Sequence, residues 1–293
     1  MVTVYLTDKK IPFNREFIKK LDLMIERVTQ KNPKLDAVFQ NEGGEGLGKT
    51  TFSAAQGYYI AWKTGKSFSN KNLFFDLRKA IEFGKSTENQ IIIFDEPAKG
   101  VLKAQWRNKL QQDLIELLML SRKKRHFIIF NFVKFYKFNE YIVVDRSIGM
   151  IHCYSRKNVQ SGRFRYIKRK NLEPLWRDYR FGKKRNYAKY TDPVTKGTFP
   201  DVLNPKYANN VLSEFNINKY ESEKDQAISS IGVIKKVDTP SYIQMQTRIK
   251  ILRNLKNEGI DLTQTRLSAI LGIKPTTLRE YTKKIALAPE LNT

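Results

Sequence analysis

The sequence predicts an α/β protein built on a parallel sheet, followed by a small all-α unit. Between residues 37 and 155, short apolar runs alternate with longer segments of helical periodicity, which is typical of strands joined by crossover helices. A glycine-rich turn directly follows the first of these runs. The 293 residues are enough for one medium and one small domain.

Changes in amino-acid composition and periodicity along the chain predict four segments. Residues 1–36 hold a helical lead-in whose N-cap is Asn14, and residues 37–155 hold the α/β core. A basic, aromatic extension and a proline-rich connector occupy 156–240, and 241–293 are helical again. The expected strands of the core are 37–41, 72–75, 90–95, 127–132 and 149–154. Leucines spaced along 101–124 predict a long amphipathic helix there.

The charge of the chain indicates an anionic partner. Lys and Arg number 54 against 29 Asp and Glu, a formal net charge of +25. Nucleic acid is the first candidate for neutralising such a surplus, and we expect double-stranded DNA. The chain contains neither an apolar run long enough to span a membrane nor a signal peptide, so we expect no membrane insertion and a cytoplasmic location, in a host cytoplasm if the source is viral. One cysteine and two histidines make an internal disulfide impossible and a zinc cluster improbable.

The glycine-rich turn has the G-x-x-x-x-G-K-T spacing of a phosphate-binding loop, set between a strand and a helix. Its residues and the next threonine are Gly43, Gly44, Glu45, Gly46, Leu47, Gly48, Lys49, Thr50 and Thr51. Glycines let successive N–H groups face a phosphate, Lys49 would reach the β- and γ-phosphates, and the Thr50 hydroxyl would bind Mg²⁺. Thr51 could add an α-phosphate contact. ATP and Mg²⁺ are therefore the expected cofactors.

Two further strand ends complete an ATP site. Asp95 and Glu96 follow an apolar strand. At this position Asp95 could hold the Mg²⁺ ion and Glu96 could activate the attacking water. Asn131 ends the next strand, where an amide could contact the γ-phosphate or orient the water. Hydrolysis also needs a cation for the transition state, and Arg122, Arg125 and Arg146 are candidates for one supplied by a neighbouring subunit. Each of these residues also has a purely structural alternative. Asp95 and Glu96 could be an ordinary polar end of a strand, Asn131 an ordinary turn residue, and the arginines simply exposed to solvent.

These motifs resemble a known family. The order GGEGLGKTT, IIIFDEP, FIIFNF and VVDRSIGMIHCYSR is similar to the additional-strand, catalytic-glutamate P-loop ATPases of the FtsK/HerA type, over roughly residues 37–155. Within that group, Arg125-His126 and Asp145-Arg146 resemble the zonular-occludens-toxin-like ATPases. The resemblance implies a ring-forming motor that moves DNA. The chain departs from it in having Asn131 where Gln is common, and in lacking a membrane segment.

The C-terminal segment predicts a helix-turn-helix. Leu267, Leu271, Leu278 and Tyr281 have core spacing, and Gly272 allows the turn between two helices. The second helix would expose Lys274, Thr276, Thr277, Arg279 and Lys283 to a major groove. The alternative is a helical hairpin for protein contacts.

The segment 156–189 is basic and aromatic. Lys168, Arg169 and Lys170 are expected to contact DNA phosphates. Its aromatic side chains could stack on bases, although a small core beneath a charged face is the favoured interpretation.

We therefore expect an ATP-hydrolysing, DNA-binding motor that forms a homo-oligomeric ring, such as a DNA translocase or a packaging ATPase of a virus or mobile element. A helicase loader or replication-initiation ATPase uses the same parts. A nucleotide-switched DNA-binding regulator is the non-enzymatic alternative, and Glu96 argues against it.

Overall fold

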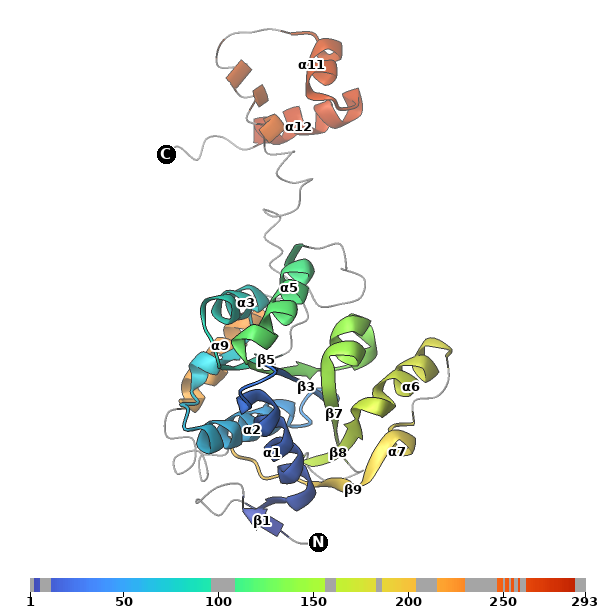
Figure 1. Cartoon of the computed structure of the whole chain (residues 1–293). Coiled ribbons are helices and arrows are strands. Elements are labelled where there is room, and N and C mark those ends of the chain that lie inside the picture. The colour runs from blue at the N-terminus through green and yellow to red at the C-terminus, as the bar shows by residue number, and fades with distance from the viewer. Residues whose placement is uncertain are drawn as a thin grey trace. The chain divides into compact units, whose positions relative to one another are not determined.

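The computed structural model describes residues 3–5, 12–95, 109–155, 162–182, 186–203, 215–229, 247–249, 251–252, 254–255, 258 and 262–287. The chain forms two compact units, Met1–Ala227 and Ile228–Thr293. Figure 1 shows the elements of both.

The first unit is built on a seven-stranded sheet of order β4-β5-β6-β3-β7-β8-β9. Its strands are β3 (Ala37–Glu42), β4 (Leu73–Phe74), β5 (Ile91–Asp95), β6 (Phe127–Phe132), β7 (Ser147–Tyr154), β8 (Arg163–Lys168) and β9 (Thr191–Thr198). Neighbours from β4 to β7 pair in parallel, and β8 and β9 are antiparallel. The predicted α/β class is confirmed, and the five expected strands agree to within two residues.

The position of β6 identifies the class of sheet. It lies between β3, which leads into the glycine-rich loop, and β5, which ends in Asp95. This is the additional strand expected for a P-loop NTPase of the catalytic-glutamate class. The polar residues that end these three strands consequently meet at one edge of the sheet.

Helices cover both faces of the sheet (Figure 1). The face that carries Phe39 packs against α1 (Arg15–Thr29) and α2 (Lys49–Thr64), and α9 (Ile217–Ser229) joins this core through Tyr220. The face that carries Val38 packs against α3 (Leu77–Ser86), α5 (Lys109–Lys124) and α6 (Arg169–Arg180). Successive residues of a strand point to opposite faces, so one apolar strand serves two cores.

Shorter elements complete the first unit. They are β1 (Thr3–Tyr5), β2 (Pro12–Asn14), α7 (Tyr187–Tyr190), the 3₁₀ turns η1 (Asn70–Asn72) and η3 (Phe135–Lys137), and the π-helical turn η4 (Tyr141–Arg146). Asn14 caps α1 by accepting the Phe17 N–H, as the sequence predicts.

The structure divides the chain differently from the four predicted segments. Helix α1 packs on β3, and β8 pairs with β7, so residues on both sides of the expected core belong to one unit. The connector expected to be loop-rich contains β9 and α9. Pro193 does not prevent β9 from forming, because β9 is an edge strand. The expected helix at 101–124 is seen from Lys109, and 101–108 lie outside the described residues.

Two helices joined by a tight turn stand out among the described residues of the second unit. Helix α11 (Gln264–Leu271) ends at Gly272, whose φ of 58° is left-handed, and α12 (Pro275–Leu287) follows. Leu271, Leu278 and Tyr281 pack with Ile249 and Leu252 in a small core. In the first part of the segment expected to be helical, residues 247–249, 251–252 and 254–255 are described and are helical. Among the described residues of the chain, no helix is both long and apolar enough to cross a membrane.

A buried ion pair joins the amino ends of two central strands. Arg146, the last residue of η4, pairs with Asp36, which directly precedes β3. Arg146 also donates to the carbonyl of Leu118 at 2.8 Å, and Ser121 donates to Asp36. Both charged side chains are almost fully buried. The pair therefore fixes α5, β3 and β7 to one another.

Replacing Arg146 should destabilise the first unit strongly. Arg146→Ala leaves the Asp36 carboxylate buried without its cation, which costs about 3–5 kcal/mol. Arg122→Ala, an exposed arginine on the neighbouring α5, should change stability by less than about 0.5 kcal/mol. Urea unfolding of the two variants measures the difference, and equal midpoints would contradict a structural role for the pair.

Candidate functional site

The glycine-rich loop lies at the carboxyl edge of the sheet, between β3 and α2. Gly46 and Gly48 have φ angles of 69° and 81°, which residues other than glycine rarely adopt. A Cβ on Gly43 would lie 2.4 Å from the carbonyl oxygen of Cys153, so the loop begins in direct contact with β7. The loop therefore needs glycine both for its backbone conformation and for its close approach to the neighbouring strand.

Lys49 lies at the start of α2, and its side chain folds over the loop. Its Nζ donates to the carbonyl oxygen of Gly44 at 2.8 Å, and the residue is 4% exposed. Gly44, Glu45 and Gly46 are exposed at the rim. The N-terminus of α2 adds its partial positive charge to that of the lysine. Together these groups form a cradle for an anion of phosphate size.

Thr50 and Asp95 meet beside this cradle. The Thr50 hydroxyl lies 3.0 Å from both carboxylate oxygens of Asp95, although 45 residues separate the two in sequence. Asp95 is 2% exposed and Thr50 is half-buried. A hydroxyl and a carboxylate are the hard oxygen donors that Mg²⁺ prefers, so these residues fit the metal expected from the sequence.

Asn131 holds Asp95 in place. Its Nδ2 donates to Asp95 Oδ1 at 2.8 Å and to Ser53 Oγ at 2.9 Å, and its side chain is fully buried. Asn131 lies in register with Asp95 on one side and Asn41 on the other. The role predicted from the sequence, a contact with the γ-phosphate or orientation of the water, stays a prediction. The contacts that the structure describes are those of a positioning residue for Asp95.

Three polar residues of this network were not singled out from the sequence. Asn41 donates to Asn131 Oδ1 at 3.0 Å and to Gln56 Oε1 at 2.9 Å, and Ser53 bonds both Asn131 and the Thr50 carbonyl. The available signal was the polar sequence QNE at the end of an otherwise apolar strand, where apolar residues are expected in a sheet covered on both faces.

The candidate arginines lie near the opposite edge of the sheet. Arg146 is buried against Asp36, so the structure contradicts its role as a cation offered to a neighbouring subunit: reaching out would break a buried ion pair. Arg125 is half-buried and donates to the Lys31 carbonyl at 2.7 Å. Arg122 is exposed. Glu96 lies outside the described residues.

The aromatic residues of the extension are mostly structural, as the favoured interpretation predicts. Trp176 is 1% exposed, Tyr179 stacks on Tyr136, and Tyr187 stacks on His152. Lys168 pairs with Asp192, and Arg169 donates to the Asp145 carbonyl at 3.0 Å, whereas Lys170 is exposed. Among the described residues from 162 to 198, the exposed cations are Arg169, Lys170, Arg177, Arg180, Lys189 and Lys196.

On the second unit, the predicted contact residues lie on and just before α12. Lys274, Thr276 and Arg279 are exposed, and Thr277 is half-buried. The side chain of Lys283 lies outside the described residues. Arg279 Nε donates to Gln264 at 3.4 Å, across the turn between the helices.

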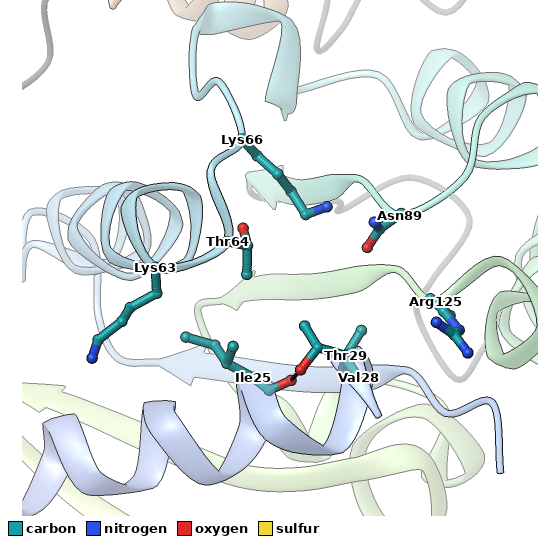
Figure 2. Close-up of a pocket in the computed structure, with 8 residues that line it drawn as sticks. All are labelled: Ile25, Val28, Thr29, Lys63, Thr64, Lys66, Asn89 and Arg125. Carbon is teal, nitrogen blue, oxygen red and sulfur yellow. Dashed lines mark hydrogen bonds between the residues drawn. The ribbon is translucent and has the colours of Figure 1, made fainter. Parts of the chain in front are cut away.

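A cavity of about 400 Å³ lies at the far end of α2 from the loop. Figure 2 shows Lys66 reaching towards Asn89, while Lys63 points away. Both lysines stand at the carboxyl end of α2, where cations stabilise the helix dipole, and the hydroxyls of Thr29 and Thr64 donate back to their own helices. Sixteen helical residues, roughly 24 Å, separate this cavity from the loop. It is therefore no part of the phosphate site.

Burial changes the pKa of one cysteine and one histidine of the first unit. Burial raises the pKa of the Cys153 thiol, so it remains protonated. Burial also lowers the pKa of His126, whose Nδ1 accepts the Gln90 N–H and whose Nε2 faces the Gly84 carbonyl. The described residues contain no cluster of three or more His, Cys, Asp or Glu able to hold a metal ion.

Comparisons with known proteins give only distant likenesses. No family model matches the chain, and no curated protein matches it. Among solved structures, it is similar to the genome packaging NTPase B204 from Sulfolobus turreted icosahedral virus 2 in complex with AMPPCP, at 13% identity, with a TM-score of 0.34 over 47% of this chain and 94% of that one. It is also similar to AMPPCP-bound DnaA from Aquifex aeolicus, at 12% identity and a TM-score of 0.34, over 93% and 87% of the two chains. Thermotoga maritima RuvB matches at 17% identity and 0.35, over 96% and 92%. The fold assignment rests on the strand order and the loop described above.

Asn131→Ala should weaken binding of a magnesium–nucleotide complex by at least about tenfold, because Asp95 loses a hydrogen bond to a charged group. Binding of the nucleotide in EDTA should change much less. Asn72→Ala is the control, since Asn72 is also buried but donates to the Ile91 carbonyl, away from Asp95. Titration with a fluorescent nucleotide checks both variants. Equal losses in the two would refute a positioning role for Asn131.

Proposed function

We propose that the protein is an ATP-hydrolysing, DNA-binding motor, of the kind that translocates or packages DNA for a virus or mobile element. The observation that carries the ATPase assignment is the contact of Thr50 with Asp95 at 3.0 Å, beside a loop with the G-x-x-x-x-G-K-T spacing. These two residues are distant in sequence but meet beside the loop, and their hydroxyl and carboxylate oxygens would suit an Mg²⁺ ion that accompanies the nucleotide.

The residues divide the work of the site. Loop N–H groups and Lys49 bind the phosphates, and Thr50 and Asp95 would hold Mg²⁺, which supplies positive charge against the phosphate oxygens. Asn131 keeps Asp95 in position. Glu96, which follows Asp95 in sequence, is assigned to orient and deprotonate the attacking water.

Two regions with exposed basic residues, the extension and α12, support the proposal that the protein binds DNA. Six exposed cations lie among the described residues of the extension up to residue 198, and α12 offers exposed residues on a helix of groove-reading size. We assign general phosphate contacts to the extension and sequence preference to α12 in a helix-turn-helix, because phosphate contacts position a protein and base contacts specify. We further propose assembly into a homo-oligomeric ring, for which exposed Arg122 remains a candidate transition-state cation.

Directional movement distinguishes the motor from the alternatives. A translocase should displace a bound roadblock from one end of a duplex in an ATP-dependent manner. A helicase loader would instead need its helicase for any ATP-dependent effect on DNA. ATP binding without turnover would indicate a nucleotide-switched regulator.

Lys49→Ala and Glu96→Gln should separate binding from hydrolysis. The first removes the phosphate cation, so nucleotide binding should be lost. The second neutralises only the water-activating carboxylate, so ATP should stay bound with Mg²⁺ while turnover falls by at least about a hundredfold. ATP affinity and phosphate release are measured on both. Full hydrolysis by Glu96→Gln would remove Glu96 from the mechanism.

The two DNA-binding regions should also separate. Replacing Lys170 and Arg180, both exposed on α6, with alanine should flatten the plot of log affinity against log salt by about 0.9 for each DNA phosphate that is no longer neutralised. Truncation after Val237 should leave ATP hydrolysis and general binding intact but abolish preference for a selected DNA sequence. Salt titrations on random and selected DNA test both. A truncated protein that still prefers the selected sequence would show that α12 is not the reader.

A further inference from the structure

A buried carboxylate directly precedes the phosphate-binding loop. Glu42 is the last residue of β3, next to Gly43, and is 3% exposed. His152 Nδ1 lies 2.6 Å from its Oε2, and the Tyr187 hydroxyl donates to its Oε1 at 2.9 Å. Each carboxylate oxygen therefore has its own partner, one from β7 and one from α7.

The partners of Glu42 belong to the basic extension or are stacked on it. The His152 ring lies parallel to that of Tyr187, with centroids 3.9 Å apart. Helix α7 is in turn fastened to α6, since Asn171 donates to the Tyr190 carbonyl at 2.9 Å and Tyr190 donates to Asp178. The exposed cations Lys170 and Arg180 lie on α6. A continuous series of contacts thus runs from the charged surface to Glu42.

The extension also touches the other end of the loop. Phe199, just after β9, packs edge-on against Phe52 of α2, with centroids 4.8 Å apart. A Cβ on Gly48 would lie 2.9 Å from the Phe199 ring. The extension therefore contacts both ends of the loop: Tyr187 at Glu42, the residue before the first glycine, and Phe199 at the last glycine. A shift of α7 or of the residues after β9 would act on one of these ends.

We propose that the extension controls the conformation of the phosphate-binding loop through Glu42, His152 and Tyr187, so that DNA bound on α6 changes nucleotide affinity. This rests on the proposed ATPase and DNA-binding functions. Glu42 acts as a positioning residue: displacement of α7 must either break its bond to Tyr187 or move the residue that precedes Gly43. An unpartnered oxygen of a buried carboxylate is unfavourable, so α7 and the loop move together.

Tyr187→Phe tests this relay in the full-length protein, because it removes the hydroxyl and keeps the stacked ring. Tyr59→Phe is the matched control: it removes a tyrosine–carboxylate bond, to Asp22 at 2.6 Å, that takes no part in the contacts between α6 and Glu42. Hydrogen exchange of peptides covering 43–50 should accelerate by at least about tenfold in Tyr187→Phe and stay unchanged in Tyr59→Phe. Glu42→Gln, a change of equal size, should act like Tyr187→Phe and serves if that variant does not fold.

The second readout is the effect of DNA on ATP. In wild type and Tyr59→Phe, saturating DNA should change the KM for ATP, and in Tyr187→Phe that change should disappear while DNA affinity is retained. A DNA effect equal in all three proteins would overturn the relay. A wild type that neither hydrolyses ATP nor responds to DNA would refute the proposed function instead. The exchange measurement still decides the relay in that case, and unchanged exchange at 43–50 in both Tyr187→Phe and Glu42→Gln would overturn it.

Discussion

The hydrogen bond from Asn131 to Asp95 is the contact on which the geometry of the phosphate site depends. It ties β6 to β5 at the edge where the loop begins, and Asp95 in turn meets Thr50 on α2. Since Asn131 also bonds Ser53, the first two turns of α2 are aligned with two strands at once. An amide suits this position because it supplies two donors and carries no charge beside the carboxylate. Asn131 thus positions both α2 and the end of β5.

Polar side chains of β3 connect the phosphate site to several other elements of the first unit. All six of its residues are buried, yet its last three are polar. Gln40 donates to the Val143 carbonyl at 2.8 Å, Asn41 bonds Gln56 of α2, and Glu42 bonds His152 of β7. Each buried polar side chain needs a partner, and here each partner comes from a different element. One short strand therefore sets the positions of η4, α2 and β7 relative to the loop.

Much of this site could be predicted from the sequence, and the limits have physical causes. The spacing of the glycines with Lys49 and Thr50, and the acidic end of β5, act through local chain geometry, so the sequence predicts them directly. The burial of Arg146 could not be predicted, because it depends on Asp36, 110 residues away, arriving at the same edge of the sheet. Tyr187 likewise lies in a basic aromatic tract of the sequence, and only the pairing of β8 and β9 returns it to β7. The pairing of β7 with β8 across residue 155 could not be predicted for the same reason: the sequence of one strand does not specify which later strand adds to it in antiparallel orientation.

The two margins of the sheet limit how subunits of this protein can associate. On one margin β4 has only two residues, and on the other β9 contains Pro193, while its Lys196 carbonyl accepts a hydrogen bond from Asn14. Short, proline-containing or covered margins do not template the addition of another strand. Copies of the chain that join through this unit would therefore meet through helices and loops, with side chains rather than backbone ladders between them. Side-chain contacts of this kind can break and re-form without unfolding either copy. They would therefore permit copies in an assembly to change conformation one after another.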